Sequence, residues 1–352
     1  MPPPELMDEL VEEVLLRLPP DDPASLFRAS GVCKPWRSIL AGPRFRRRYR
    51  EFHRTPPILG LFQQGDSFVP TSAVVPAHPG QPYWYAMDCR HGRALFAHFG
   101  ATFDLIVLDP VTGHQHRVIS PFDYSVSVSA AAAVLCAAQG CNHHGCQGGH
   151  FHLAFVSTDQ VGAISAWLYS SETAEWSEFT SSIYHSNALL QPLGVSSVLV
   201  GDALYFNISD IVECQLGTLR TSMLKKPVDG RGRLMTAEDG GLGFAAVVDV
   251  TNLTLWSMET APEGATGWAK LRVIDLKAML PDGALLIPAL EGGLLGIAEG
   301  TQVIFVSTCV GSYMVDLKSR QVRKLSCPGK IIFPYMSFYL PAMEAASTGQ
   351  GQ

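Results

Sequence analysis

A short unit of strand-like runs recurs five times along the chain, and this repeat constrains the fold more than any other feature. Each copy is a glycine-led apolar run followed, about 15 to 20 residues later, by a polar turn and another run. The copies begin at Gly92, Gly149, Gly201, Gly241 and Gly300. Short alternating or apolar runs between Gly, Asp, Ser and Pro clusters are typical of strands, so the chain from residue 57 onward is predicted to be all-β.

The period of the repeat predicts the architecture. The polar turns that contain Asp109 and Asp316 are 207 residues apart and span four steps. Each step is therefore about 52 residues, close to the roughly 50-residue period of kelch-type propellers. Propellers close by pairing the two ends of the chain, and the outlying runs 58–62 and 331–339 are candidates for the closing blade. Five clear units plus one shared blade predict six blades.

The N-terminal segment follows a helical pattern instead. Apolar side chains recur at helical spacing in residues 6–18, and prolines divide the segment into short helices. Its charge is also divided, because residues 1–22 carry seven acids against Arg17 whereas residues 34–54 carry eight bases against Glu51. So short a set of helices can barely close a core alone, and part of its apolar surface is expected to meet a partner.

The pattern changes from helical to alternating at the paired prolines Pro56 and Pro57. We therefore predict a multidomain α+β chain. Its parts are a small all-α domain at residues 1–54, an all-β propeller at 55–341 and a disordered tail at 342–352.

The helical segment carries a specific motif. Leu18-Pro19, Val32-Cys-Lys-Pro-Trp-Arg37 and Pro43-Arg-Phe45 follow one another in a characteristic order and spacing. With the leucine-rich run before them, residues 5–50 closely resemble the F-box motif. Met7 stands where that family usually has a proline beside the first leucine.

The resemblance implies docking on a Skp-type adaptor, which joins an F-box protein to a cullin-RING ubiquitin ligase. An amphipathic helical segment with surplus apolar surface suits helix-in-groove recognition. The matching motif positions give the adaptor-binding residues Leu6, Leu10, Leu15, Leu18, Pro19, Leu26, Val32 and Trp36. For each of them, a place in the internal core is the open alternative, since few interface residues carry most of the binding energy.

The propeller segment also resembles a known domain. Gly240-Gly-Leu-Gly, Leu255-Trp256, Val273-Ile-Asp-Leu276 and Phe333-Pro-Tyr-Met-Ser-Phe338 are similar to the plant F-box-associated domain, a kelch-like propeller. In that family the domain captures the target protein. The resemblance therefore implies that loops at one propeller face recognise a target, whose identity the sequence does not give.

A cluster of cysteines and histidines interrupts the repeat. Residues 136–152 hold three cysteines and four histidines, and the spacings within Cys141, Cys146, His150 and His152 could place thiolates and imidazoles around tetrahedral Zn²⁺. No second separated ligand pair accompanies them, so the alternative is a long hairpin loop of reduced thiols. The preferred interpretation is a chain without a metal.

Charge and hydropathy argue against two classes of partner. The net charge is −6, which does not favour nucleic acid or anionic lipid, and the basic block at 34–54 is interpreted as a solvated helix face that complements an acidic adaptor. The longest apolar run, 130–138, has nine residues, whereas a bilayer span needs about 18.

The acidic start lacks a secretory signal. We expect a protein of the cytoplasm or nucleus, whose eight cysteines remain thiols or metal ligands.

No catalytic motif or cofactor site is expected. The run Gly241-Leu-Gly-Phe-Ala-Ala246 matches a dinucleotide pattern only loosely, because a strand-like run follows it where a helix is required. The leading hypothesis is a non-catalytic substrate receptor of a Skp-cullin-F-box ubiquitin ligase. Two alternatives stay open: an adaptor-binding scaffold that presents no target, and a kelch-like propeller enzyme with a zinc-binding hairpin.

Overall fold

The structure is a computed structural model, and it describes most of the chain. The described residues are 7–63, 68–71, 84–99, 102–121, 127–138, 141, 143, 146, 148–180, 195–208, 210–228, 232–260, 266–284, 286, 293–326 and 329–338. Two predictions lie outside them: the contact of Leu6 and the tail at 342–352.

Four short helices form the N-terminal part, which we call the helical unit (residues 7–53). They are α1 (Asp8–Leu16), α2 (Pro23–Val32), α3 (Lys34–Ala41) and α4 (Pro43–His53). Each of the last three has a proline at its first or second position, where the missing N–H removes no intrahelical hydrogen bond. Within the described part of the chain, no helix is long and apolar enough to cross a membrane.

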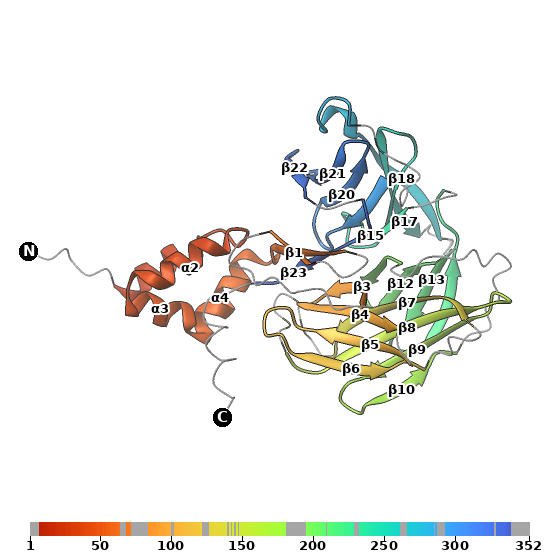
Figure 1. The fold of residues 1–352 in the computed structure, drawn as a ribbon, viewed down its shortest axis with the longest axis horizontal. Helices are drawn as coiled ribbons and strands as arrows, with labels where there is room; N and C mark the ends of the chain where they lie inside the picture. Colours follow the sequence, from red (N-terminus) through yellow and green to blue (C-terminus); the bar gives the residue numbers. More distant parts are fainter. Residues whose placement is uncertain are drawn as a thin grey trace, which may run out of the picture.

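The rest of the described chain is a six-blade β-propeller, as the period predicted (Figure 1). One blade is three-stranded in the order β2-β1-β23: β1 (Ile58–Gln63), β2 (Phe68–Pro70) and β23 (Ile332–Met336). The next two are β3 (Trp84–Arg90), β4 (Arg93–Phe99), β5 (Phe103–Leu108), β6 (Gln115–Ile119), and β7 (Ser127–Cys136), β8 (Phe151–Asp159), β9 (Ile164–Ser170), β10 (Glu175–Glu178). A fourth contains β11 (Ser197–Val200), β12 (Ala203–Asn207), β13 (Ile211–Gln215) and β14 (Arg220–Leu224).

Two further blades complete the ring. They are β15 (Arg233–Thr236), β16 (Leu242–Val247), β17 (Asn252–Thr260), β18 (Thr266–Asp275), and β19 (Leu294–Ile297), β20 (Val303–Thr308), β21 (Gly311–Asp316), β22 (Val322–Leu325), with a 3₁₀ turn η1 (Leu276–Ala278) between them. Every pair of neighbouring strands within a blade is antiparallel.

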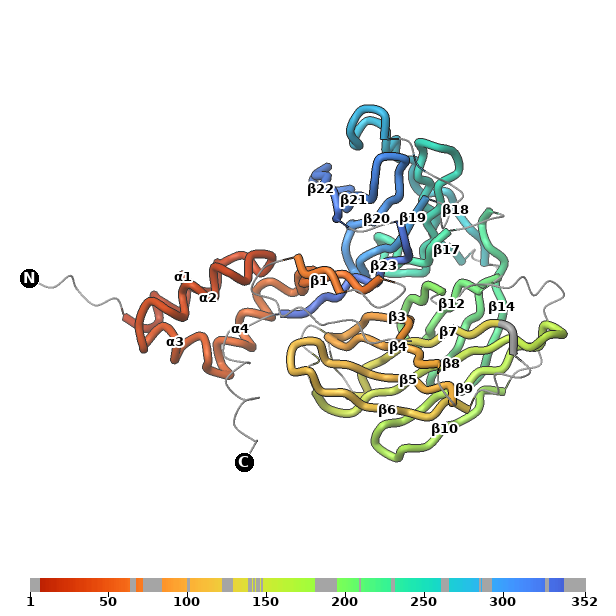
Figure 2. Tube along the Cα trace, in the orientation of Figure 1, coloured from red at the N-terminus to blue at the C-terminus, as the bar shows by residue number. Residues whose placement is uncertain are grey.

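The ring closes where the two predicted end runs meet. β1 pairs antiparallel with β23, with Leu61 opposite Pro334 and Phe62 opposite Phe333. β23 also packs against β3 on one side and β19 on the other, so the C-terminal strand is the inner strand of a blade whose outer strands come from the N-terminal side. The Cα trace in Figure 2 shows β1 and β23 side by side next to α4.

The repeat seen in the sequence corresponds to the second and third strands of each blade. The glycine-led runs are β4, β8, β12, β16 and β20. Gly92 and Gly300, in the turns before two of these strands, have φ values of 73° and 70°, a left-handed conformation that glycine adopts without strain. Asp109 and Asp316 occupy matching turns, and each Oδ1 accepts backbone N–H bonds from the residues two and three positions later.

The propeller core lies between the blades. On β7, the side chains of Ala130, Ala132 and Val134 pack with the preceding blade, whereas those of Ala131 and Ala133 pack with the following one. The nine-residue apolar run is therefore an inner strand buried on both faces, which is the environment that continuous apolar runs favour.

The helical unit and the propeller share one aromatic side chain. Phe338, two residues after β23, is buried among the helices, and its ring meets that of Tyr49 edge-on with centroids 6.0 Å apart. Ser337 N–H donates to the Pro57 carbonyl at 3.2 Å, and Tyr49 Oη donates to the Leu18 carbonyl at 2.8 Å. The end of the propeller thus completes the core of the helical unit.

Candidate functional site

The predicted adaptor-binding residues divide into exposed and buried groups. Leu10, Pro19 and Val32 are exposed, with Leu10 at 48% and Val32 at 62%. Leu15 and Leu26 are buried in the helical core. Leu18 and Trp36 are partly buried against that core. Of the predicted residues that the structure describes, the exposed ones are those that can meet a partner without unfolding.

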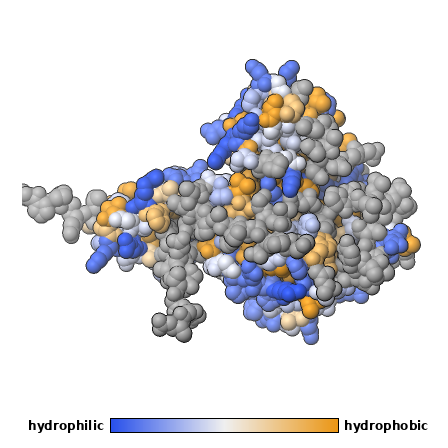
Figure 3. All heavy atoms as spheres, in the orientation of Figure 1, coloured by the Kyte–Doolittle hydropathy of each residue, from blue (hydrophilic) through white to orange (hydrophobic). Residues whose placement is uncertain are grey.

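Further exposed apolar side chains extend this surface. Met7 (65% exposed) and Val14 (58%) lie with Leu10 at positions i, i+3 and i+7 on one side of α1, which we call the α1 stripe. Phe27 on α2 and Phe52 on α4 are also about half exposed. Hydrophobic atoms reach the surface of the helical unit in Figure 3. The exposed apolar side of α1 could have been recognised in the sequence, because its apolar residues cover more of the helix than the one face that packs against a core.

Ion pairs brace the helices. Arg48 Nη1 lies 2.8 Å from Glu12 Oε1, and its other terminal nitrogen contacts Glu13, so α4 is tied to α1. The hydrogen bond from Arg48 lowers the pKa of Glu13 below its ordinary value. Arg44 and Arg47 are exposed, as expected for a solvated helix face. Within the basic block, Arg48 therefore links two helices, whereas Arg44 and Arg47 are largely exposed to solvent.

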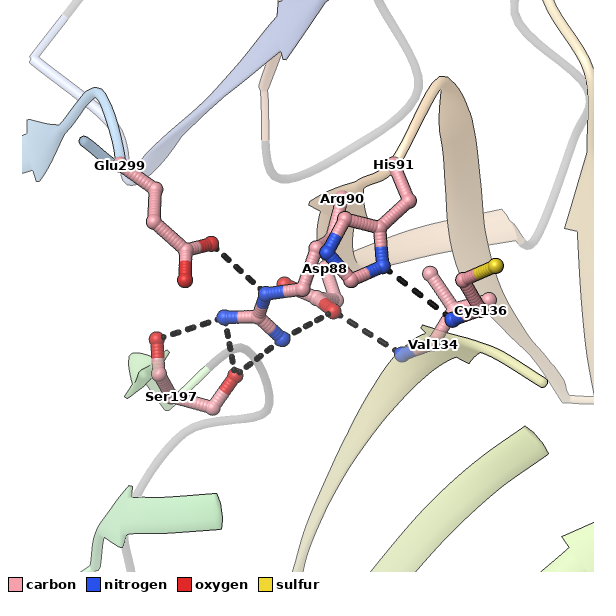
Figure 4. A network of polar contacts seen from close by, with 7 residues as sticks. All are labelled: Asp88, Arg90, His91, Val134, Cys136, Ser197 and Glu299. Atoms are coloured by element: carbon pink, nitrogen blue, oxygen red, sulfur yellow. Dashed lines mark hydrogen bonds and ion pairs between the residues drawn. The ribbon is translucent and has the colours of Figure 1, made fainter. Parts of the chain in front are cut away.

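A buried polar network joins residues of different blades (Figure 4). Arg90, at the end of β3, has a side chain only 3% exposed, and its Nε donates to Glu299 Oε2 at 2.7 Å. Its Nη1 donates to Asp88 Oδ2 at 3.0 Å and its Nη2 to the Ser197 carbonyl at 3.1 Å. Asp88 Oδ2 also accepts the N–H of Val134 at 2.9 Å. The guanidinium thus joins the blades of β3, β11 and β19, and Asp88 extends the network to β7.

The ionisation of Asp88 follows from this burial. Burial raises the pKa of Asp88 to about 6, against the lowering effects of Arg90 and the Val134 N–H and with a smaller raising effect from Glu299. The carboxylate is therefore charged at neutral pH and takes up a proton near pH 6.

We expect this pKa to appear in the pH dependence of stability. The folded pKa lies above the unfolded value of about 3.9, so proton uptake favours the folded state and this contribution is lost as the pH rises through about 6. Relative to Asp88→Asn, the wild-type free energy of unfolding should gain about 2 to 3 kcal/mol between about pH 7 and pH 4. Urea unfolding across that range measures the difference, and parallel profiles for the two proteins would contradict the assignment.

A cavity of about 350 Å³ opens at the mouth of the propeller beside the helical unit. Its wall includes the β3–β4 turn at His91 and Gly92, the β19–β20 turn at Glu299, and the linker residues 54–56. The Arg90 network forms part of the same wall. The mouth that faces the helical unit is therefore framed by inter-strand turns.

Four of the cysteines and histidines of residues 136–152 come together beside this mouth. The ligand atoms of Cys136, Cys141, His143 and Cys146 all lie within 4.8 Å of one another. Cys141 and Cys146 belong to the predicted set, whereas His150 is exposed and His152 lies within β8, and neither is among the four. Spacing alone did not select His143 over its neighbours.

Comparison with known proteins identifies one part of the chain. Residues 4–48 match the family model described as the F-box domain. No curated protein matches the chain. Among solved structures, the periplasmic gluconolactonase PpgL of Pseudomonas aeruginosa is 12% identical with a TM-score of 0.40, over 76% of this chain and 82% of that one. The SapL1 lectin, solved with alpha methyl fucoside, is 12% identical with a TM-score of 0.38, over 76% and 85%.

Proposed function

We propose, from an F-box domain at residues 4–48 joined to a six-blade propeller, that this chain is the substrate-recognition subunit of a Skp-cullin-F-box ubiquitin ligase. The helical unit docks on a Skp-type adaptor, and the propeller holds a target protein. The observation that carries the proposal is the F-box match in the same helices that expose surplus apolar surface. The kelch-like type and the likeness to plant F-box-associated domains stay predictions from the sequence.

The α1 stripe supports the docking role. Met7, Leu10 and Val14 expose apolar surface on a helix whose other side already contributes Val11 and Leu15 to a core. Burying such a side chain fully is worth about 1.5 to 3 kcal/mol, so covering the stripe would supply a large share of a stable contact. An adaptor groove lined by apolar side chains is the partner that fits it.

The contribution to catalysis would be proximity. Phe338 and the Ser337–Pro57 hydrogen bond hold the propeller against the helical unit, so a bound target would keep a defined position relative to the adaptor. A defined position raises the effective concentration of a target lysine at the ubiquitin-charged enzyme, without a catalytic group on this chain. We place this activity in the cytoplasm or nucleus, without a nucleic-acid or membrane partner.

The test is co-purification with a Skp-type adaptor. The wild-type chain should form a stoichiometric complex, and a Leu10→Asp, Val14→Asp variant should bind at least about 100-fold more weakly, because two apolar contacts are lost and charges enter the interface. Both side chains are exposed, so circular dichroism should not change. Leu15→Asp is unsuitable, since Leu15 is buried and its loss would disrupt the fold.

The matched control is Val161→Asp, which places a charge at a 76% exposed valine of the propeller and should leave adaptor binding unchanged. Equal binding by the α1-stripe variant and the wild type would contradict the proposed docking surface. Adaptor binding with no cellular protein whose ubiquitination depends on this chain would favour the scaffold alternative.

A further inference from the structure

Four metal-ligating groups converge where the β7–β8 connection meets the propeller mouth. Cys141 Sγ lies 3.2 Å from Cys146 Sγ, and His143 Nδ1 lies 3.4 Å from the same sulfur. Cys136, the last residue of β7, completes the group within 4.8 Å. Three thiol sulfurs and one imidazole nitrogen thus lie close enough together to bind a single ion.

The donor set and its spacing fit one metal. With Zn–S near 2.3 Å and Zn–N near 2.0 Å, the ligands of a tetrahedral site are about 3.5 to 3.8 Å apart. The Cys141–Cys146 and His143–Cys146 distances are within about half an ångström of this, and no other pair of ligand atoms needs to contract by more than about 1 Å. Thiolates with one imidazole select Zn²⁺ over the hard cations Mg²⁺ and Ca²⁺. Four protein ligands leave no open position, which is the property of a structural site.

The neighbouring hairpin turn holds this group in place. His91 in the β3–β4 turn stacks on the His143 ring, with centroids 4.1 Å apart and 13° between the planes. The N–H of Cys136 donates to His91 Nδ1 at 3.1 Å. Arg93 donates to the Gly149 carbonyl at 3.0 Å, at the point where the connection returns to β8. Outer contacts of this kind orient ligands before a metal arrives.

The surrounding charge also suits a metal thiolate centre. One Zn²⁺ with three thiolates carries a net charge of −1, which is stabilised by nearby cations. Arg93, which donates to the Gly149 carbonyl beside the cluster, is such a cation.

We propose that Cys136, Cys141, His143 and Cys146 bind a structural Zn²⁺ ion. The ion would tie the end of β7 to residues 141, 143 and 146 of the β7–β8 connection at the mouth of the propeller. Because His143 and Cys146 line the mouth cavity, the metal would also shape its wall. This inference does not depend on adaptor binding or on the identity of a target.

The test is the metal content of the full-length chain, purified under reducing conditions with Zn²⁺ supplied. Elemental analysis should find about one zinc per chain. Cys141→Ser and His143→Ala should each lower the zinc content at least about tenfold. The matched controls are His152→Ala and Cys309→Ser, which change the same residue types outside the cluster and should keep the metal.

A second measurement keeps the proposal testable if the ligand variants misfold. Wild-type protein reconstituted with Co²⁺ should show thiolate-to-metal charge-transfer absorption and the intense d–d bands of tetrahedral coordination. A metal-free wild type, iron in place of zinc, or a Cys141–Cys146 disulfide found by peptide mapping would each overturn the proposal. Zinc retained by both ligand variants would do the same.

Discussion

Replacing Arg90 with methionine should lower the free energy of unfolding of the propeller by about 3 to 5 kcal/mol. The main cost comes from the carboxylates that lose their counter-charge, and less from the loss of one favourable contact. Asp88 and Glu299 both interact with this guanidinium, and Asp88 is buried, so the variant would leave a carboxylate in a low-dielectric interior without its counter-charge. Urea unfolding followed by tryptophan fluorescence measures the change.

Two further variants serve as controls for this prediction. Arg323→Met removes an exposed arginine from β22 and should change stability by no more than about 0.5 kcal/mol. The double variant Asp88→Asn, Arg90→Met should be more stable than Arg90→Met alone, since the unpaired charge is gone. A cost below about 1 kcal/mol for Arg90→Met would show that the network does not hold the blades together.

Truncation of Phe338 to alanine should cost the helical unit about 3 to 5 kcal/mol and loosen its attachment to the propeller. The side chain is buried among the helices and contacts Tyr49, so alanine would leave a cavity in a small core that has little else to fill it. Hydrogen exchange should report the loss as faster exchange in α4, with the propeller strands unaffected.

Phe52 provides the matched control for this substitution. It lies on α4 near the same core but is 54% exposed, so Phe52→Ala should change exchange in the helices little. If Phe338→Ala left hydrogen exchange in α4 at the wild-type rate, the Phe338 side chain would not stabilise the helical unit. The linker alone would then join the helical unit to the propeller.

Much of the propeller could be predicted because local turn residues mark the middle strands of the four-stranded blades. A glycine precedes the second strand, as at Gly92, and in two blades an aspartate turn follows the third, as at Asp109; both are local requirements of backbone geometry and therefore appear in the sequence. The first and fourth strands were less visible. β11 has four residues, and β10 is largely exposed, so neither shows the alternation that identifies a strand.

The contacts at the mouth could not be predicted from the sequence. Arg90 and Glu299 are 209 positions apart, and only the closed ring brings them together. The choice of His143 over His150 depends on how the β7–β8 connection folds against the β3–β4 turn. The motif also predicted both Leu15 and Leu10 as adaptor-binding residues, although Leu15 is buried and Leu10 is exposed. Sequence shows which residue types are present, whereas partners distant in the chain require the fold.

Closure of the ring by β23 has a consequence for biosynthesis. A ribosome releases the helices and five blades before it reaches the strand that completes the first blade and the phenylalanine that completes the helical core. Until then, β1 lacks its hydrogen-bonded inner neighbour and β3 lacks the blade that packs beside it, so the nascent chain exposes a strand edge on which chaperones or other chains can act. A premature stop before residue 332 would therefore disable both parts at once, and the cell would receive an unfolded polypeptide instead of a shortened receptor.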